Sequence, residues 1–117
     1  MIEERYYACG KGWEPLILCV EALVNKYNLE HLDIEFPIEI SDIKEKWGLL
    51  DITLSGEYNK ELWKQSSNIC KESEYICEFC GTKENVERKD THGWIMTLCD
   101  KCRKEELKRH NKIFIEK

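Results

Sequence analysis

The 117-residue sequence contains no run of about 18 apolar residues, so no segment is expected to cross a membrane. Its first five residues, 1–5, are acidic and lack the apolar stretch of a secretory signal. Internal repeats, low-complexity tracts and flexible linkers are also missing, and the chain has only two prolines. These absences predict one small folded unit in the reducing cytoplasm, with no membrane contact.

An excess of basic residues is also missing. Lysine and arginine number 18 against 23 aspartates and glutamates, which gives a net charge of −5. Residues 1–76 hold eight basic and fifteen acidic side chains, and residues 77–117 hold ten and eight. Strong non-specific binding to nucleic acid needs a basic field. We therefore expect weak binding to nucleic acid.

The seven cysteines do not suit a disulfide scaffold, because one would be left without a partner. Four of them form two CxxC pairs, Cys77 with Cys80 and Cys99 with Cys102, and 18 residues separate the pairs. Each pair can bring two sulfurs to about 2.3 Å from one zinc ion. Four thiolates complete a tetrahedral shell with no position left for water, which is typical of a structural site. The sequence therefore predicts one structural Zn²⁺ held by these four cysteines.

Three other interpretations of the cysteine pairs stay open. A single CxxC would suit a redox dithiol, although the second pair favours a metal. Iron could occupy the same four sulfurs, as in rubredoxin-like sites. His92 is a possible replacement ligand, but four thiolates already suffice, and its place before Gly93 favours a turn.

The spacing of apolar residues predicts the elements of an N-terminal body. Helical spacing over 13–27 indicates an amphipathic helix, with Asn28 as its stop. Alternating apolar and polar residues over 36–40 and 50–54 indicate the strands of an antiparallel hairpin. A second helix is expected over 58–76, and it runs directly into the first ligand pair.

The remaining segment, 77–117, is predicted to be a zinc finger rigidly attached to the body, 1–76. Between the cysteine pairs, 86–89 and 94–98 are expected to form a short hairpin, and a helix is expected to start at the second pair and run over 100–108. A knuckle, a hairpin and then a helix that supplies the second pair is the order of a treble clef. The predicted fold class is α+β: helix, hairpin, helix, then a treble-clef-like zinc finger.

Four segments form a combination that covers nearly the whole chain. They are Cys9-Gly10-x-Gly12-Trp13-x-Pro15-Leu16-Ile17, Lys44-Glu45-Lys46-Trp47-Gly48-x-Leu50, Cys77-x-x-Cys80-Gly81 and Gly93-Trp94-Ile95-x-Thr97-Leu98-Cys99. Together they resemble a family of small proteins of bacteria and their phages and prophages. The resemblance implies an α+β body with a C-terminal zinc finger, and it brings no established activity. Some relatives carry histidine at the last ligand position, where this chain has Cys102.

Other candidate residues are better explained as structural. Cys9 precedes the first helix near Lys11, where a thiol could be activated, but no catalytic partner accompanies it. Cys19 and Cys70 are expected to be half-buried on helices. Acidic residues in the first half of the chain fit a solvated face, and lone His31 is interpreted in the same way. These acidic residues are Glu30, Asp33, Glu35, Glu39 and Asp42.

The basic residues after the second cysteine pair allow an alternative function. They are Lys101, Arg103, Lys104, Lys108, Arg109 and Lys112. On a helix they could contact phosphate groups, although Glu105 and Glu106 interrupt them and make a solvated helix with ion pairs the simpler interpretation. A nucleic-acid-binding regulatory finger is therefore the second hypothesis.

The main hypothesis is a small zinc-binding protein that is not an enzyme and acts by binding another macromolecule, most simply a protein. Four tryptophans without interleaved basic residues suit a protein partner better than stacked bases. The resemblance to phage proteins suggests a specific version, an accessory or anti-defence protein that blocks a bacterial enzyme in the host cytoplasm.

Overall fold

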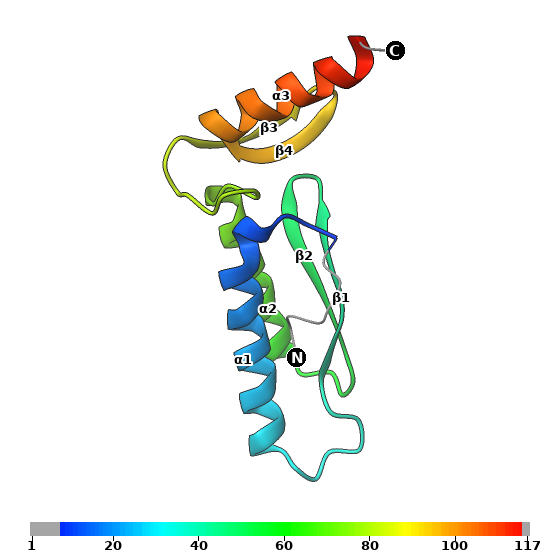
Figure 1. Ribbon diagram of the computed structural model, residues 1–117. Coiled ribbons are helices and arrows are strands. Elements are labelled where there is room, and N and C mark those ends of the chain that lie inside the picture. Colours follow the sequence, from blue (N-terminus) through cyan, green and yellow to red (C-terminus); the bar gives the residue numbers. More distant parts are fainter. Residues whose placement is uncertain (1–7, 116–117) are drawn as a thin grey trace.

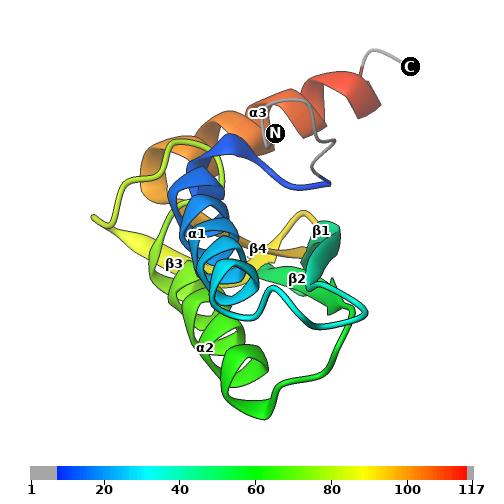
Figure 2. The same ribbon diagram turned by 90° about the horizontal axis from the view of Figure 1, so that it is seen from below.

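The computed structural model describes residues 8–115 of the chain, which form an elongated α+β molecule (Figure 1). Its body consists of helix α1 (Glu14–Glu30), the antiparallel strands β1 (Glu39–Lys46) and β2 (Leu49–Ser55), and helix α2 (Lys60–Lys71). The two helices lie beside each other and the hairpin covers them along one side (Figure 2). The predicted mixture of helices and antiparallel hairpins is confirmed.

The C-terminal finger lies across one end of the body (Figure 1). It contains strands β3 (Val86–Thr91) and β4 (Trp94–Cys99), which pair antiparallel, and helix α3 (Asp100–Ile115). The strands extend one or two residues beyond the predicted ranges, and α3 is longer than the predicted 100–108. The predicted order of knuckle, hairpin and helix is present.

Helix α1 starts one residue after the predicted position and is preceded by a 3₁₀ turn, η2 (Lys11–Trp13). The predicted stop at Asn28 was wrong, because the helix continues to Glu30. The Asn28 side chain instead donates to the Ile38 carbonyl at 2.9 Å and accepts from the Ile38 N–H at 3.0 Å. It therefore clamps the helix to the start of the hairpin.

The first strand was predicted too early in the sequence. Residues 36–38 precede β1, and the polar stretch 42–46, which was not assigned to a strand, forms most of it. A two-residue turn explains the shift: Trp47 and Gly48 both have positive φ, at 56° and 78°, which suits a tight hairpin turn. Because the turn is so short, the polar residues before it must pair with β2.

The second helix is shorter than predicted. Asn59 caps α2 by accepting from the Leu62 N–H at 3.0 Å, and after Lys71 the chain tightens into a 3₁₀ turn, η3 (Glu72–Tyr75). Ser73 is fully buried there, and its hydroxyl donates to the Cys70 carbonyl and accepts from the Leu50 N–H. This hydroxyl ties the end of the helix to β2 and explains why regular α-helix stops before 76.

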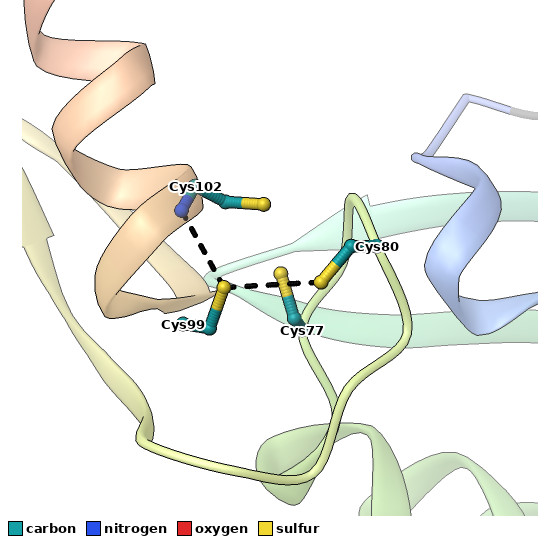
Figure 3. A group of neighbouring side chains, drawn as sticks. All are labelled: Cys77, Cys80, Cys99 and Cys102. Atoms are coloured by element: carbon teal, nitrogen blue, oxygen red, sulfur yellow. Dashed lines mark hydrogen bonds between the residues drawn. The ribbon is translucent and has the colours of Figure 1, made fainter.

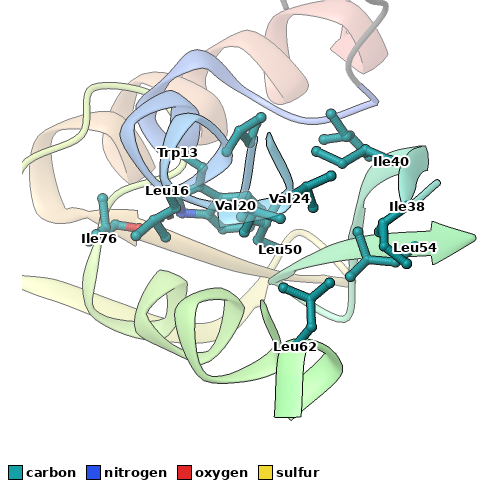
Figure 4. Packing of buried hydrophobic residues seen from close by; sticks show 12 residues of the cluster. Trp13, Leu16, Val20, Val24, Ile38, Ile40, Leu50, Leu54, Leu62 and Ile76 are labelled. Carbon is teal, nitrogen blue, oxygen red and sulfur yellow. Dashed lines mark hydrogen bonds between the residues drawn. The ribbon is translucent and has the colours of Figure 1, made fainter. Parts of the chain in front are cut away.

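The body has its own apolar core between the two helices and the hairpin (Figure 4). Its buried members are Trp13, Leu16, Ile17, Val20, Val24, Ile38, Ile40, Ile43, Leu50, Leu54, Leu62 and Ile76. Every element of the body contributes to this core, so burial of apolar side chains stabilises the body.

No helix within the described part of the chain is long and apolar enough to cross a bilayer.

Candidate metal centre

The structure brings together the four cysteines of the two CxxC pairs. Cys77 and Cys80 lie in the loop after η3, Cys99 ends β4, and Cys102 lies in the first turn of α3. Their sulfur atoms all lie within 4.8 Å of one another and point toward a common centre (Figure 3). Three of these residues are buried and Cys80 is exposed.

The spacing of the sulfurs fits a tetrahedral metal site. Four thiolates at about 2.3 Å from a zinc ion would lie about 3.8 Å from one another. The Sγ atoms of Cys80 and Cys99 are 3.8 Å apart. The Cys102 N–H also points at the Cys99 sulfur, at 3.4 Å, as backbone donors do toward metal-bound thiolates. The donor set therefore suits a metal ion that prefers sulfur ligands. Four sulfurs would fill its tetrahedral shell and leave no coordination position for a substrate.

The pKa values of Cys77 and Cys102 indicate how a bound cation would act on the cluster. Burial acts to raise the pKa of Cys77, but nearby backbone N–H groups outweigh it and lower the pKa to about 7. Burial and then the neighbouring sulfurs raise the pKa of Cys102 far above its ordinary value. One thiolate thus opposes the ionisation of its neighbour, and a divalent cation bound among the sulfurs would offset this repulsion.

The first ligand pair is held directly by the body. The Gly12 N–H donates to the Glu78 carbonyl at 2.7 Å, and the Trp13 indole N–H donates to the Ile76 carbonyl at 2.9 Å. A Cβ atom at Gly12 would lie 2.1 Å from the Cys77 carbonyl oxygen, closer than any such contact allows. Glycine at position 12 therefore permits the close approach of the body to the metal loop.

Glu78 is a structural residue that the sequence analysis missed. It lies between Cys77 and Cys80, yet it is buried, and its carboxylate accepts from the Gly10 N–H at 2.9 Å. Burial raises the pKa of this carboxyl, with smaller contributions from Glu45 and Glu106. A charged residue inside a CxxC loop normally faces water, so only the nearness of Gly10 could have revealed its role.

The finger is held together by a buried arginine. Arg103 lies on α3, and its guanidinium donates to the carbonyls of Leu98 and Glu87 and to the Thr91 hydroxyl. It therefore connects α3 to both strands of the hairpin. Arg103 was predicted to lie with the other basic residues on a solvated helix, which was wrong: the short finger has few apolar residues to fill this buried position.

A second polar cluster fastens the β3–β4 turn to α3. His92 has the predicted turn position, with φ of 49°, and its Nε2 lies 2.8 Å from the buried Glu106 carboxylate. Arg109 donates to both oxygens of that carboxylate, and the His110 ring stacks on His92 with centroids 4.0 Å apart. Although burial opposes ionisation, Arg109 and His92 hold the pKa of Glu106 below its ordinary value.

The turn of the β1–β2 hairpin packs against the middle of the β3–β4 hairpin, and a cleft lies beside this contact. The Thr97 hydroxyl donates to the Gly48 carbonyl, and Arg88 Nε donates to the Trp47 carbonyl at 2.7 Å. Beside these contacts is an open cleft of about 500 Å³. It is lined by Glu45, Lys46, Trp47, Asp90, Gly93, Trp94 and Ile95. The body and the finger both contribute to it, so its shape depends on the attachment of the finger.

The other candidate cysteines show no sign of activation. Burial, with Glu78 and Glu45 nearby, raises the pKa of Cys9 to about 11, which is the opposite of what a reactive thiol requires. Cys70 is half-buried as predicted, whereas Cys19 is exposed. The predicted acidic residues and His31 all lie at the surface, in agreement with a solvated face.

Comparisons with known proteins were negative: no family model, no curated protein and no solved structure matches this chain. The resemblance to small phage and prophage proteins therefore stays a prediction, and the function has to be inferred from the geometry of the site.

Proposed function

We propose that the protein is a protein-binding module in which one structural zinc ion, held by Cys77, Cys80, Cys99 and Cys102, fixes the shape of the binding surface. The observation that carries the proposal is the cleft at the junction of the two hairpins. Trp47 is 65% exposed and Trp94 is 60% exposed at this cleft. Exposed tryptophans beside a cleft are typical of protein–protein hot spots.

The metal supports this role through the order of the elements. The loop of Cys77 and Cys80 is attached to the body, and Cys99 is the last residue of the strand that lines the cleft. An ion that joins the two pairs keeps β4 beside the β1–β2 turn. We assign the finger to the treble-clef type because a knuckle, a hairpin and a helix follow one another in that order.

The basic residues of α3 give little support to nucleic-acid binding. Arg103 is buried, and Arg109 is engaged with Glu106. Lys101, Lys104 and Lys108 are exposed, but the acidic residues of the body oppose the approach of phosphate. The narrower proposal, that the partner is a bacterial enzyme blocked by a phage accessory protein, rests on the sequence resemblance and on this acidic body.

A peptide-display selection tests the proposed function. The zinc-loaded protein is presented to a library of random peptides, and the enriched peptides are then tested against Trp47→Ala and Trp94→Ala. We expect enrichment of peptides that lose at least about tenfold in affinity on one of these variants. The matched control is Trp63→Ala, which changes a tryptophan outside the cleft.

Two results would contradict the proposal. One is a selection without enrichment on the zinc-loaded protein. The other is sub-micromolar binding to random duplex DNA at physiological salt, which would favour the nucleic-acid function instead.

A further inference from the structure

The cleft between the two hairpins combines aromatic and acidic groups. Trp47 and Trp94 are the largest of its lining residues, and Glu45 and Asp90 bring a carboxylate from each hairpin. Tryptophan has the most strongly attractive ring face for a cation, and the attraction increases when water is displaced. An aromatic cleft with two carboxylates is chemically suited to a cationic group.

Both carboxylates are fixed by the turns that they cap. One oxygen of Glu45, Oε2, accepts from the Gly48 N–H at 2.7 Å, and Asp90 Oδ1 accepts from the Gly93 N–H at 2.7 Å. Each carboxylate has a second oxygen for a further donor. Because the turns already hold these side chains, a ligand would not need to order them, and this reduces the entropic cost of binding.

The charges around the cleft favour a cation. The two hairpins together contain six acidic and four basic residues, and the whole chain carries −5. Of the basic residues near the cleft, Arg88 is hydrogen-bonded to the Trp47 carbonyl, which directs its Nε to the turn. Lys46 is exposed at the rim and is the cation that would oppose a positively charged ligand.

We propose that this cleft receives the arginine or lysine side chain of an extended segment in the partner protein. The inference rests on the proposed function and deepens it by naming the chemistry of the bound residue. The cationic group would lie against the tryptophans and donate to the carboxylates of Glu45 and Asp90.

Nuclear magnetic resonance of the zinc-loaded protein gives a direct test. The probes are N-acetyl-arginine-N-methylamide and its citrulline counterpart, which has nearly the same shape without the charge. We expect arginine to shift the indole N–H signals of Trp47 and Trp94, while the signal of buried Trp13 stays in place. The citrulline probe should bind about fivefold more weakly.

Charge variants sharpen the test. Glu45→Gln and Asp90→Asn keep an oxygen for the turn N–H groups but remove the charge, so each should weaken arginine binding about threefold or more. Lys46→Gln should strengthen it. Glu87→Gln is the control, because Glu87 pairs with Lys89 on the same hairpin and does not line the cleft.

Equal binding of the arginine and citrulline probes would overturn the inference, as would arginine binding that the Glu45 and Asp90 variants leave unchanged. The peptide selection separates this failure from that of the proposed function. Peptides that depend on Trp47 or Trp94 but contain no basic residue would refute the cationic ligand alone. A selection that enriches no peptide would refute the binding module itself.

Discussion

In the body, apolar side chains from both helices and both strands meet in one core, whereas the finger has little apolar material to bury. Within the described residues, the finger's buried cluster is Leu98 with Cys77, Cys99 and Cys102, supported by half-buried Val86 and Met96. The finger instead buries polar groups, above all Arg103 and Glu106, that connect its helix to its hairpin.

This difference shows that two regions of one short chain can depend on different forces. The body should respond mainly to losses of buried apolar volume. The finger should respond to losses of metal ligands and of buried hydrogen bonds, because a core of its size contributes little hydrophobic free energy. The following predictions test this division, from the largest expected effect to the smallest.

Loss of a metal ligand should produce the largest difference between the responses of the finger and the body. We expect Cys99→Ser to abolish stoichiometric zinc and to expose residues 82–115 to protease, while the secondary structure of the body largely persists. The reason is that a closed thiolate site contributes on the order of 10–16 kcal/mol of apparent binding free energy, which is also folding free energy. Elemental analysis, limited proteolysis and circular dichroism measure these effects.

Cys9→Ser and Cys19→Ser are the controls, because neither residue belongs to the sulfur cluster. A Cys99→Ser protein that stays metal-loaded and protease-resistant would contradict the division between the regions. A folded Cys9→Ser protein that loses partner binding would show that binding depends on Cys9 and not only on the metal ligands.

The attachment of the finger to the body should be lost with Gly12→Ala. The added methyl would overlap the carbonyl oxygens of Cys77 and Glu78, and these backbone atoms cannot turn aside as the end of a flexible side chain does. We expect a loss of about 3 kcal/mol in the free energy of unfolding, measured in urea, together with weaker zinc binding. Gly93→Ala is the control: it has positive φ but open space around it, and should cost only about 1 kcal/mol.

The buried arginine should stabilise the finger independently of the metal. Arg103→Met leaves the carbonyls of Glu87 and Leu98 without their donor, and we expect a loss of about 2 kcal/mol. Zinc content should stay near one per chain. Lys104→Met, at the exposed neighbouring position, should change stability by less than about 0.5 kcal/mol. Equal effects of the two substitutions would show that the finger does not depend on Arg103.

The effect that is smallest at neutral pH concerns Cys9. Its pKa, raised by burial to about 11, keeps it a neutral thiol in the folded protein up to strongly alkaline pH. The unfolded thiol ionises near its ordinary pKa of 9.0, so this residue should reduce stability as pH rises from about 9 toward 11. At pH 8.5 iodoacetamide should modify exposed Cys19 before Cys9, as mass spectrometry of the zinc-loaded protein can measure. Faster modification of Cys9 would contradict the raised pKa.

Local patterns were enough to predict much of the fold. Helical spacing located α1, alternation indicated the first hairpin, the turn at His92 and Gly93 agreed with the second, and the CxxC pairs predicted the cysteines that the structure brings together. These features depend on residues close in sequence. The second half of β1 was missed because Asp42 and Lys44 are polar and the strand is exposed on one side.

Contacts between distant residues were not predictable in this way. The burial of Glu78 depends on Gly10, which is 68 positions away, and the end of α2 depends on a hydrogen bond from Leu50 to Ser73. The cleft likewise joins the turn at Trp47 to the strand that starts at Trp94. No periodicity in the sequence carries such information, since each contact exists only after the elements have packed.

The joint at Gly10, Gly12 and Trp13 also constrains the order of events during folding. Its hydrogen bonds from Gly10 and Trp13 connect residues 63 to 68 positions apart, whereas Cys80 and Cys99 are 19 apart. Closing the longer loop costs about 1 kcal/mol more chain entropy. Bringing the two cysteine pairs together thus costs less chain entropy than closing the joint. The joint also needs η2 and η3 to come together first. A refolding chain should therefore bind its metal before the finger packs against the body.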